Sequence, residues 1–191
     1  MNIMCDKKNC VSGKSDYEVK KLEQYKTSSF GLPMVLFNSV DAYQCKNCDE
    51  ILEINVPDPE GLMLTAALAR IINPYKLNGK EIQFLRKVLD LKASSLAQAL
   101  EVTPETISRW ENDQRPINSS SEKLLRMIVA FNLLDDVEGI DFDLKVFADM
   151  KTKGFRSEED EFVMEFELMK VRDSKSRTTK EVYGQAQAKV A

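Results

Sequence analysis

The first part of the chain carries short runs of alternating apolar and polar residues, separated by turn-forming residues. The strand-like runs extend over residues 17–25, 33–40, 42–44 and 50–56. Gly31 closes the turn after the first run, and Pro57 and Pro59 follow the last one. This pattern predicts a short antiparallel sheet of hairpins, and its few apolar residues predict a thin core.

After Pro59 the apolar spacing changes to the period of a helix. A first helix is predicted from there to about Asn73, where Pro74 ends it, and we interpret it as a connector between two units. Short helices joined by tight turns are then predicted over residues 80–89, 94–100, 104–113 and 120–131. Pro116 forces the break between the last two, because proline cannot continue a helix. Residues 80–134 are therefore predicted to form a compact helical unit.

The remaining segment gives a weaker pattern. A helix is predicted over residues 142–150, and alternation over residues 162–168 predicts a strand. A helix is the alternative for the second of these, because glutamate, methionine and leucine favour helices. From Arg172 onward the chain is polar and is predicted to fray.

Composition is that of a soluble folded protein. The 191 residues are 43% apolar and 30% charged, and no apolar run approaches the roughly 18–20 residues that a membrane helix needs. The net charge is −4, and residues 76–135 hold nine basic against eight acidic side chains, so a DNA surface there must be a local patch. Because the chain has no histidine, the usual general base is missing and no enzymatic activity is expected. No signal peptide pattern follows the N-terminal charges, so a cytoplasmic location is expected.

Four cysteines form two close pairs, Cys5 with Cys10 and Cys45 with Cys48. A zinc ribbon presents four thiolates from two such pairs, and zinc would supply folding energy that the thin core lacks. Two disulfides or four unrelated buried thiols are the alternatives. A cytoplasmic chain disfavours the first, and the paired spacing disfavours the second. We predict one Zn²⁺ per chain, with a structural role, because four cysteines leave no open coordination position.

The strongest local signal is the run over residues 91–112, which predicts two short helices joined by a tight turn. Thr103 is placed to cap the second helix with Pro104 at its first position, and Ser94 or Ser95 is placed to cap the first. So short a turn makes the helices cross steeply, which is the geometry of a helix-turn-helix. A helix held in this way can enter the major groove of double-stranded DNA.

Spacing along the second helix separates an inner face from an outer one. Ile107 and Trp110 share the inner face, so Trp110 is assigned to the core. The side chains predicted to contact DNA are Ser94, Thr103, Glu105, Thr106, Ser108 and Arg109. Arg109 can bind a guanine edge or a phosphate, and a surface ion pair with Glu105 is the alternative. Glu111 is interpreted as the structural partner of a basic group in the same unit.

The sequence Thr-Ile-Ser-Arg-Trp-Glu-Asn at residues 106–112 resembles the Xre/Cro-like helix-turn-helix family. Together with the cysteine pairs, residues 1–134 resemble the MqsA/YgiT family of antitoxins and transcriptional regulators. The resemblance implies a structural zinc, a homodimer on a palindromic operator and, for several members, a cognate toxin protein. It places the base-reading positions of the family at Glu105 and Arg109.

The chain departs from that family at several positions. Ala93 replaces a common glutamine, Glu101 a usual turn glycine and Glu105 a usual asparagine, and the segment after Leu134 has no counterpart in the shortest members. Glu105 would accept a hydrogen bond from cytosine instead of binding adenine. These departures bear on the operator sequence more than on DNA binding itself.

Together these patterns predict an α+β protein of two domains, in which a small zinc-ribbon-like β domain precedes an all-α Cro/Xre-like helix-turn-helix domain. The predicted parts are a four-cysteine zinc-binding β domain over residues 1–58, a connector over 59–78, the helix-turn-helix domain over 79–135 and a C-terminal extension over 136–191. The expected function is sequence-specific repression of transcription, as the antitoxin of a toxin–antitoxin pair that regulates its own operon. The alternative is a zinc-containing protein-interaction module that no longer binds DNA.

Overall fold

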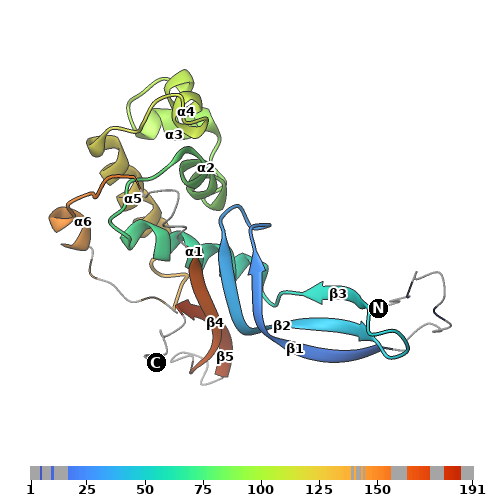
Figure 1. The fold of residues 1–191 in the computed structure, drawn as a ribbon. Coiled ribbons are helices and arrows are strands. Elements are labelled where there is room, and N and C mark those ends of the chain that lie inside the picture. Colours follow the sequence, from blue (N-terminus) through green and yellow to red (C-terminus); the bar gives the residue numbers. More distant parts are fainter. Residues whose placement is uncertain are drawn as a thin grey trace.

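The computed structural model describes Cys5, Cys10 and residues 17–138, 140, 143, 145–155, 163–172 and 179–185. Within this part of the chain, six helices lie together beside a five-stranded sheet (Figure 1). The strands come from both ends of the chain and the helices from its middle. Among the described residues, no helix has the length and apolar character of a membrane span.

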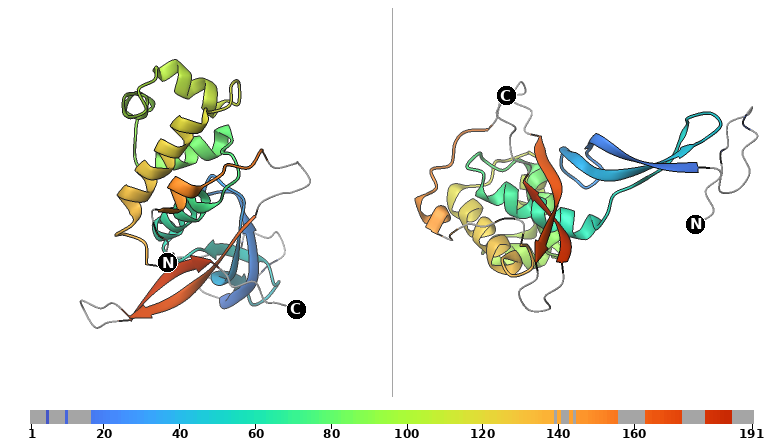
Figure 2. Two further views of the ribbon diagram at one scale, coloured as in Figure 1. Left: turned by 90° about the vertical axis from the view of Figure 1, so that its left-hand side faces the viewer. Right: turned by 90° about the horizontal axis from the view of Figure 1, so that it is seen from below.

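The sheet is built around β2. Its strands are β1 (Tyr17–Thr27), β2 (Met34–Cys45), β3 (Ile51–Asn55), β4 (Met164–Arg172) and β5 (Thr179–Gln185). One edge of β2 pairs antiparallel with β1. The other edge is shared, because β4 pairs in parallel with Met34–Phe37 and β3 pairs antiparallel with Asp41–Gln44. β5 pairs antiparallel with β4 (Figure 2). The sheet is mixed, because β2 and β4 pair in parallel and the other strands pair antiparallel.

This topology overturns the predicted succession of a zinc-ribbon-like β domain and an all-α domain. The N-terminal hairpins supply only part of the sheet, and β4 and β5 from the C-terminal segment complete it. The burial of apolar side chains gives the reason. Met164 and Phe166 of β4 pair with Met34 and Leu36 of β2, and all four are buried. Residues far along the chain therefore complete the core that the local sequence leaves thin.

The C-terminal predictions are confirmed in part. A strand is present over residues 164–168 and continues to Arg172, while Phe162 lies outside the described residues. The prediction of a frayed end is wrong for β5, which lies beyond Arg172. Tyr183 explains why β5 is held, since it is 1% exposed and its hydroxyl donates a hydrogen bond to the Pro57 carbonyl oxygen at 2.8 Å.

The helices are α1 (Pro59–Ile72), α2 (Gly79–Val88), α3 (Ala93–Ala99), α4 (Pro104–Glu111), α5 (Ser119–Leu133) and α6 (Lys145–Asp149). The sequence predicts each of them to within a few residues, although Phe142, in the range predicted for the last, lies outside the described residues. Side chains that accept hydrogen bonds from first-turn N–H groups mark four of the starts, namely Asp58, Asn78, Thr103 and Asn118.

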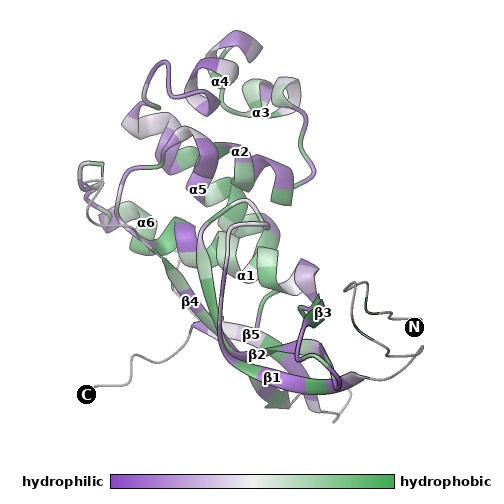
Figure 3. Cartoon of the chain, turned by 45° about the vertical axis from the view of Figure 1, so that its right-hand side comes forward, coloured by the Kyte–Doolittle hydropathy of each residue, from purple (hydrophilic) through white to green (hydrophobic). Residues whose placement is uncertain are grey.

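Helix α1, which the sequence analysis interprets as a connector between two units, is a core element of the structure. Its side chains Leu62, Ala66, Leu68 and Ile71 are fully buried, and most of the helix has the colours of hydrophobic residues in Figure 3. The helix packs on β5, α2 and α5. One buried cluster therefore includes side chains from the sheet, α1 and the helix-turn-helix region.

Two buried ion pairs hold the segment between α1 and α2, and the first is formed by Arg70. Arg70 is 1% exposed and pairs with Glu81 of α2, with Nη2 2.7 Å from Oε2. The same guanidinium donates to the carbonyl oxygens of Tyr75 and Lys76 at 3.2 and 3.1 Å. Glu81 also accepts a hydrogen bond from the backbone N–H of Asn78 at 2.8 Å, which completes the capping box of α2. The pair therefore fixes the start of α2 relative to α1.

The second pair is formed by Arg126 and Glu122 of α5, both almost fully buried, with Nη2 2.8 Å from Oε1. Arg126 donates to the carbonyl oxygens of Asn73 and Tyr75, each at 2.7 Å. Glu122 Oε1 accepts the backbone N–H of Leu77 at 3.0 Å, whereas Oε2 has no partner among the described residues. Burial lowers the pKa of Arg126, and the adjacent Glu122 carboxylate opposes that fall.

Removal of the Arg126 side chain is expected to destabilise the fold strongly. We expect Arg126→Ala to lower the free energy of unfolding by about 3–5 kcal/mol, because Glu122 would keep a buried charge without its partner. Urea unfolding followed by circular dichroism measures the loss. Lys145→Ala, at an exposed position on α6, is the control and should change stability little. A loss below about 1 kcal/mol for Arg126→Ala would contradict the role of the pair.

Candidate metal centre and helix-turn-helix surface

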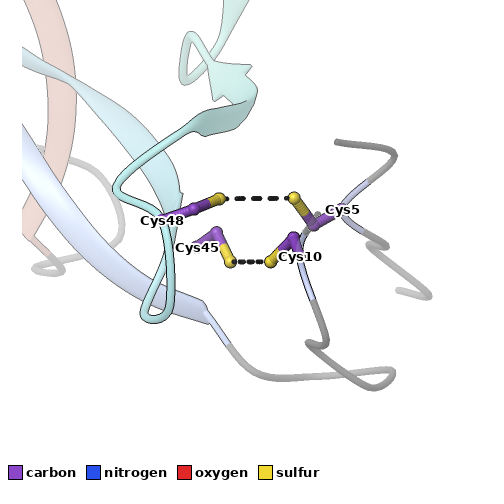
Figure 4. Close-up of side chains that lie close together, drawn as sticks. All are labelled: Cys5, Cys10, Cys45 and Cys48. Atoms are coloured by element: carbon purple, nitrogen blue, oxygen red, sulfur yellow. Dashed lines mark hydrogen bonds between the residues drawn. The ribbon is translucent and has the colours of Figure 1, made fainter. Parts of the chain in front are cut away.

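The four predicted metal ligands lie together in the structure (Figure 4). Cys45 ends β2 and Cys48 lies in the turn before β3, whereas Cys5 and Cys10 precede β1. The sulfurs of Cys5 and Cys48 are 3.5 Å apart, as are those of Cys10 and Cys45, and all four lie within 4.8 Å of one another. These four residues form no disulfide with one another.

The turn between β2 and β3 positions the second cysteine pair. The backbone N–H of Cys45 donates to the Glu50 carbonyl oxygen at 2.9 Å, and the Cys45 carbonyl oxygen accepts from Asp49 at 3.0 Å. Asp49 has a φ of 57°, a left-handed conformation that aspartate tolerates better than most residues. The side chain of Gln44 donates to the Asp49 carbonyl oxygen at 2.6 Å. This compact turn aims Cys45 and Cys48 at the first pair.

The sulfur arrangement fits a metal ion held by four thiolates. A tetrahedral site with metal–sulfur distances near 2.3 Å separates its sulfurs by roughly 3.8 Å, which lies between the 3.5 Å pairs and the 4.8 Å limit observed here. The N–H of Glu50 lowers the pKa of the Cys48 thiol, but burial and the three neighbouring thiols raise it to about 12. Four thiolates this close together would repel one another, and a metal ion between them would offset that repulsion.

Helices α3 and α4 form a helix-turn-helix. Leu96 of α3 and Ile107 of α4 are both fully buried, and the N–H of Val102 in the turn donates to the Ala97 carbonyl oxygen at 2.9 Å. Glu101 has a φ of 53°, the left-handed conformation for which glycine is favoured. The family that the chain resembles usually has a glycine at this position. The structure shows a left-handed backbone there, which glutamate adopts only with strain.

Helix α4 is anchored to α2 as well as to the core. Trp110 is 2% exposed, which confirms its assignment to the core. Glu111 binds Arg86 through two hydrogen bonds of 2.6 and 3.0 Å, and this interaction raises the pKa of Arg86. The basic partner expected for Glu111 is therefore Arg86. A Cβ on Gly79 would lie 2.5 Å from the Glu111 carbonyl oxygen, and the Gly79 N–H donates to Asp113 at 2.7 Å, so α2 begins in direct contact with the end of α4.

The outer face of this unit carries the residues predicted to contact DNA. Thr106 is half-buried, and the exposed ones are Ser94, Thr103, Glu105, Ser108 and Arg109. Thr103 caps α4 as predicted, since its hydroxyl accepts the N–H of Thr106 at 3.3 Å. The predicted cap on α3 is wrong, because α3 begins at Ala93 after Lys92 and has no side-chain cap.

The charge of Arg109 acts on Glu105 without an ion pair between them in the described part of the chain. The pKa of Glu105 is lowered by hydrogen bonds from its own backbone N–H and from Thr103, and then by the positive charge of Arg109. Glu105 is therefore a carboxylate at neutral pH. Arg109 stays exposed one turn further along α4.

Sequence reasoning missed the residues that hold α2 against α4. Arg86 is one of nine basic residues in the helical region, and only tertiary packing selects it as the partner of Glu111. Gly79, at the first position of α2, is a further signal in the sequence, since glycine permits a close backbone approach. The capping box of Asn78 and Glu81 was likewise visible three residues apart in the sequence.

Comparisons with known proteins give no match, whether with protein-family models, curated proteins or solved structures. The resemblance to the Xre/Cro-like and MqsA/YgiT families therefore stays a prediction. The structure itself shows the four-cysteine cluster and the helix-turn-helix arrangement of α3 and α4.

We expect the cysteine cluster to bind one divalent metal ion per chain. Titration with Co²⁺ should give the absorption band of thiolate-to-cobalt charge transfer, which reports sulfur ligation directly. Cys48→Ser should weaken binding by at least about tenfold, because it removes one of four thiolates. Lys46→Ala lies exposed in the same turn and offers no metal ligand, so it is the matched control. Unchanged cobalt affinity in Cys48→Ser would exclude the four-sulfur site.

Proposed function

We propose that the protein is a sequence-specific DNA-binding repressor of transcription, in which α4 enters the major groove. The observation that carries the proposal is the two-sided character of α4. Ile107 and Trp110 fix its inner face, and polar side chains cover its outer face. A helix held in this way has both the shape and the hydrogen-bonding groups needed to contact base edges.

Each outer residue has a role that suits its chemistry. Arg109 is exposed and forms no ion pair within the described residues, so its guanidinium is available to a guanine edge or a phosphate. Thr103 lies at the start of α4, where hydroxyl and N–H groups bind backbone phosphates. The Glu105 carboxylate can accept a hydrogen bond from the amino group of cytosine. The hydroxyl groups of Ser94 and Ser108 can donate a hydrogen bond to a base edge or to a backbone phosphate.

The charge of this surface favours selective contacts over general attraction to DNA. Lys92 precedes α3 and Arg115 follows α4, and both are exposed. The rest of the chain brings the net charge to −4, which repels DNA except where these cations lie. Few phosphate contacts are then made, so affinity should fall less steeply with salt than for a strongly basic protein.

We further propose a homodimer, which a palindromic operator requires because each half-site takes one α4. Helix α5 and its C-cap carry an apolar stripe at helical spacing that is exposed in the described part of the chain. Its members are Leu124, Met127, Phe131 and Leu134, with exposed fractions of 41%, 50%, 83% and 37%. A two-fold axis through such a stripe would bring the same apolar side chains of both copies into contact and remove them from water.

The four-cysteine cluster is proposed to hold zinc. A tetrahedral set of four thiolates is the usual structural zinc site, and it leaves no position for substrate. The ion would join the segment before β1 to the β2–β3 turn. The resemblance to the MqsA/YgiT family supports a role as the antitoxin of a cognate toxin, and neighbouring genes would identify that partner.

DNA binding is tested with the promoter of the protein's own gene. We expect Arg109→Ala to weaken specific binding by about 1–3 kcal/mol, if Arg109 contacts a base, with less effect on unrelated DNA. Fluorescence anisotropy with both DNAs measures the difference. Lys145→Ala is the matched control, since it removes a cation that is remote from α4. No binding, or equal binding to both DNAs by the unmodified protein, would favour a protein-interaction module instead.

The dimer is tested at the most exposed residue of the stripe. Phe131→Glu should convert the protein to a monomer, because it places a charge in the apolar contact and removes its largest side chain. Sedimentation equilibrium measures the mass. Asn132→Glu adds the same charge at the adjacent exposed position, outside the stripe, and should leave the dimer intact. A Phe131→Glu protein that remains dimeric would place the interface elsewhere.

A further inference from the structure

A cavity of about 770 Å³ lies between the tip of the β1–β2 hairpin, the first turns of α1 and one face of α2. Its size falls within the range of roughly 300–1,000 Å³ typical of small-molecule sites. It is separate from the outer face of α4 and from the cysteine cluster, since it contains none of their residues. Neither the metal site nor DNA binding explains it.

Apolar side chains form most of the cavity wall. Phe30 comes from the hairpin tip, Met63 and Leu64 from α1, and Phe84 from α2. The hairpin tip is tightly seated, since a Cβ on Gly31 would lie 3.0 Å from the Phe84 ring and the φ of Gly31 is +97°. The three elements therefore form a cavity that exists without a ligand, so that binding would require little ordering of the chain.

The charged residues in the cavity lining are two lysines and one glutamate. Lys80 and Lys87 stand two turns apart on the same face of α2, and both are exposed at the cavity rim. Lys87 donates to the side chain of Gln83 at 3.2 Å, which holds its ammonium over this face. Glu60 is the one acidic residue in the lining, so the rim carries an excess of positive charge.

We propose that this cavity binds a small amphipathic anion, with an apolar body against Phe30, Met63 and Phe84 and one acidic group at Lys80 and Lys87. The apolar wall accounts for the body, because a ligand there removes apolar surface from water on both sides. The two ammonium groups account for the charge, because they would pair with a carboxylate or sulfonate at the rim. The site requires neither DNA nor metal, so its test is independent of the proposed function.

The test uses the full chain and anilinonaphthalene sulfonate, an amphipathic anion that fluoresces in apolar surroundings. Saturable fluorescence is expected, and decanoate should displace the probe several-fold better than decanol or decylamine, which have the same chain length. Lys80→Gln and Lys87→Gln should each weaken the binding of decanoate by about three- to fivefold, which is the effect expected from the loss of one exposed ion pair. Lys145→Gln, on α6, should leave the affinity unchanged.

Two further variants locate the probe. Met63→Trp should fill the cavity and reduce probe binding, while circular dichroism verifies that the protein is folded. Phe131→Ala removes the most exposed apolar side chain on α5 and should leave probe binding intact. The proposal is overturned if decanoate fails to displace the probe, if decylamine displaces it equally well, or if Phe131→Ala rather than Met63→Trp abolishes the signal.

Discussion

The two buried arginine–glutamate pairs are the interaction on which the rest of the structure depends. The segment from Asn73 to Leu77 lies between α1 and α2, and its carbonyl groups accept hydrogen bonds from Arg70 and Arg126. Buried charges of this kind are costly unless every partner is present, so they permit one arrangement of the helices and penalise others. They join the part of the molecule that carries the sheet to the part that carries the helix-turn-helix.

This junction explains how two candidate sites are held by one fold. Helix α1 packs on β5 on one side and on α2 and α5 on the other. The β2–β3 turn with its cysteines and helix α4 then lie at different ends of the molecule (Figures 1 and 2). The anchor of α4 continues from the same junction, since α2 carries both Glu81, which pairs with Arg70, and Arg86, which pairs with Glu111.

The helices could be predicted from the sequence because their signals are local. Thr103 followed by Pro104, and the periodic Ile107 and Trp110, define α4 within a few adjacent residues. The cysteine cluster was predictable for the same reason, since paired spacing constrains four residues to two short loops. The predictions that the cluster binds zinc and that α4 binds DNA concern partners of the chain, and the packing of the chain itself does not test them.

The sheet could not be predicted in the same way. Parallel pairing of β4 with β2 joins segments far apart in the chain, and no turn signal accompanies such a pairing. The apolar alternation of β4 indicated a strand but not its neighbour. The burial of Arg70 could not be predicted either, because a charged residue near the end of a helix is usually exposed, whereas this one is buried and hydrogen-bonded.

The shared edge of β2 has a consequence for the synthesis of the protein. During translation, β1, β2, β3 and the cysteine turn leave the ribosome first, and their contacts with one another are short in sequence. The stretch Met34–Phe37 must wait for its partner in β4, which is made about 130 residues later. Until then a buried, apolar strand edge is open to other chains. A nascent chain is therefore most exposed to mispairing while the helical region is being made, and β4 and β5 complete the sheet once they have been made.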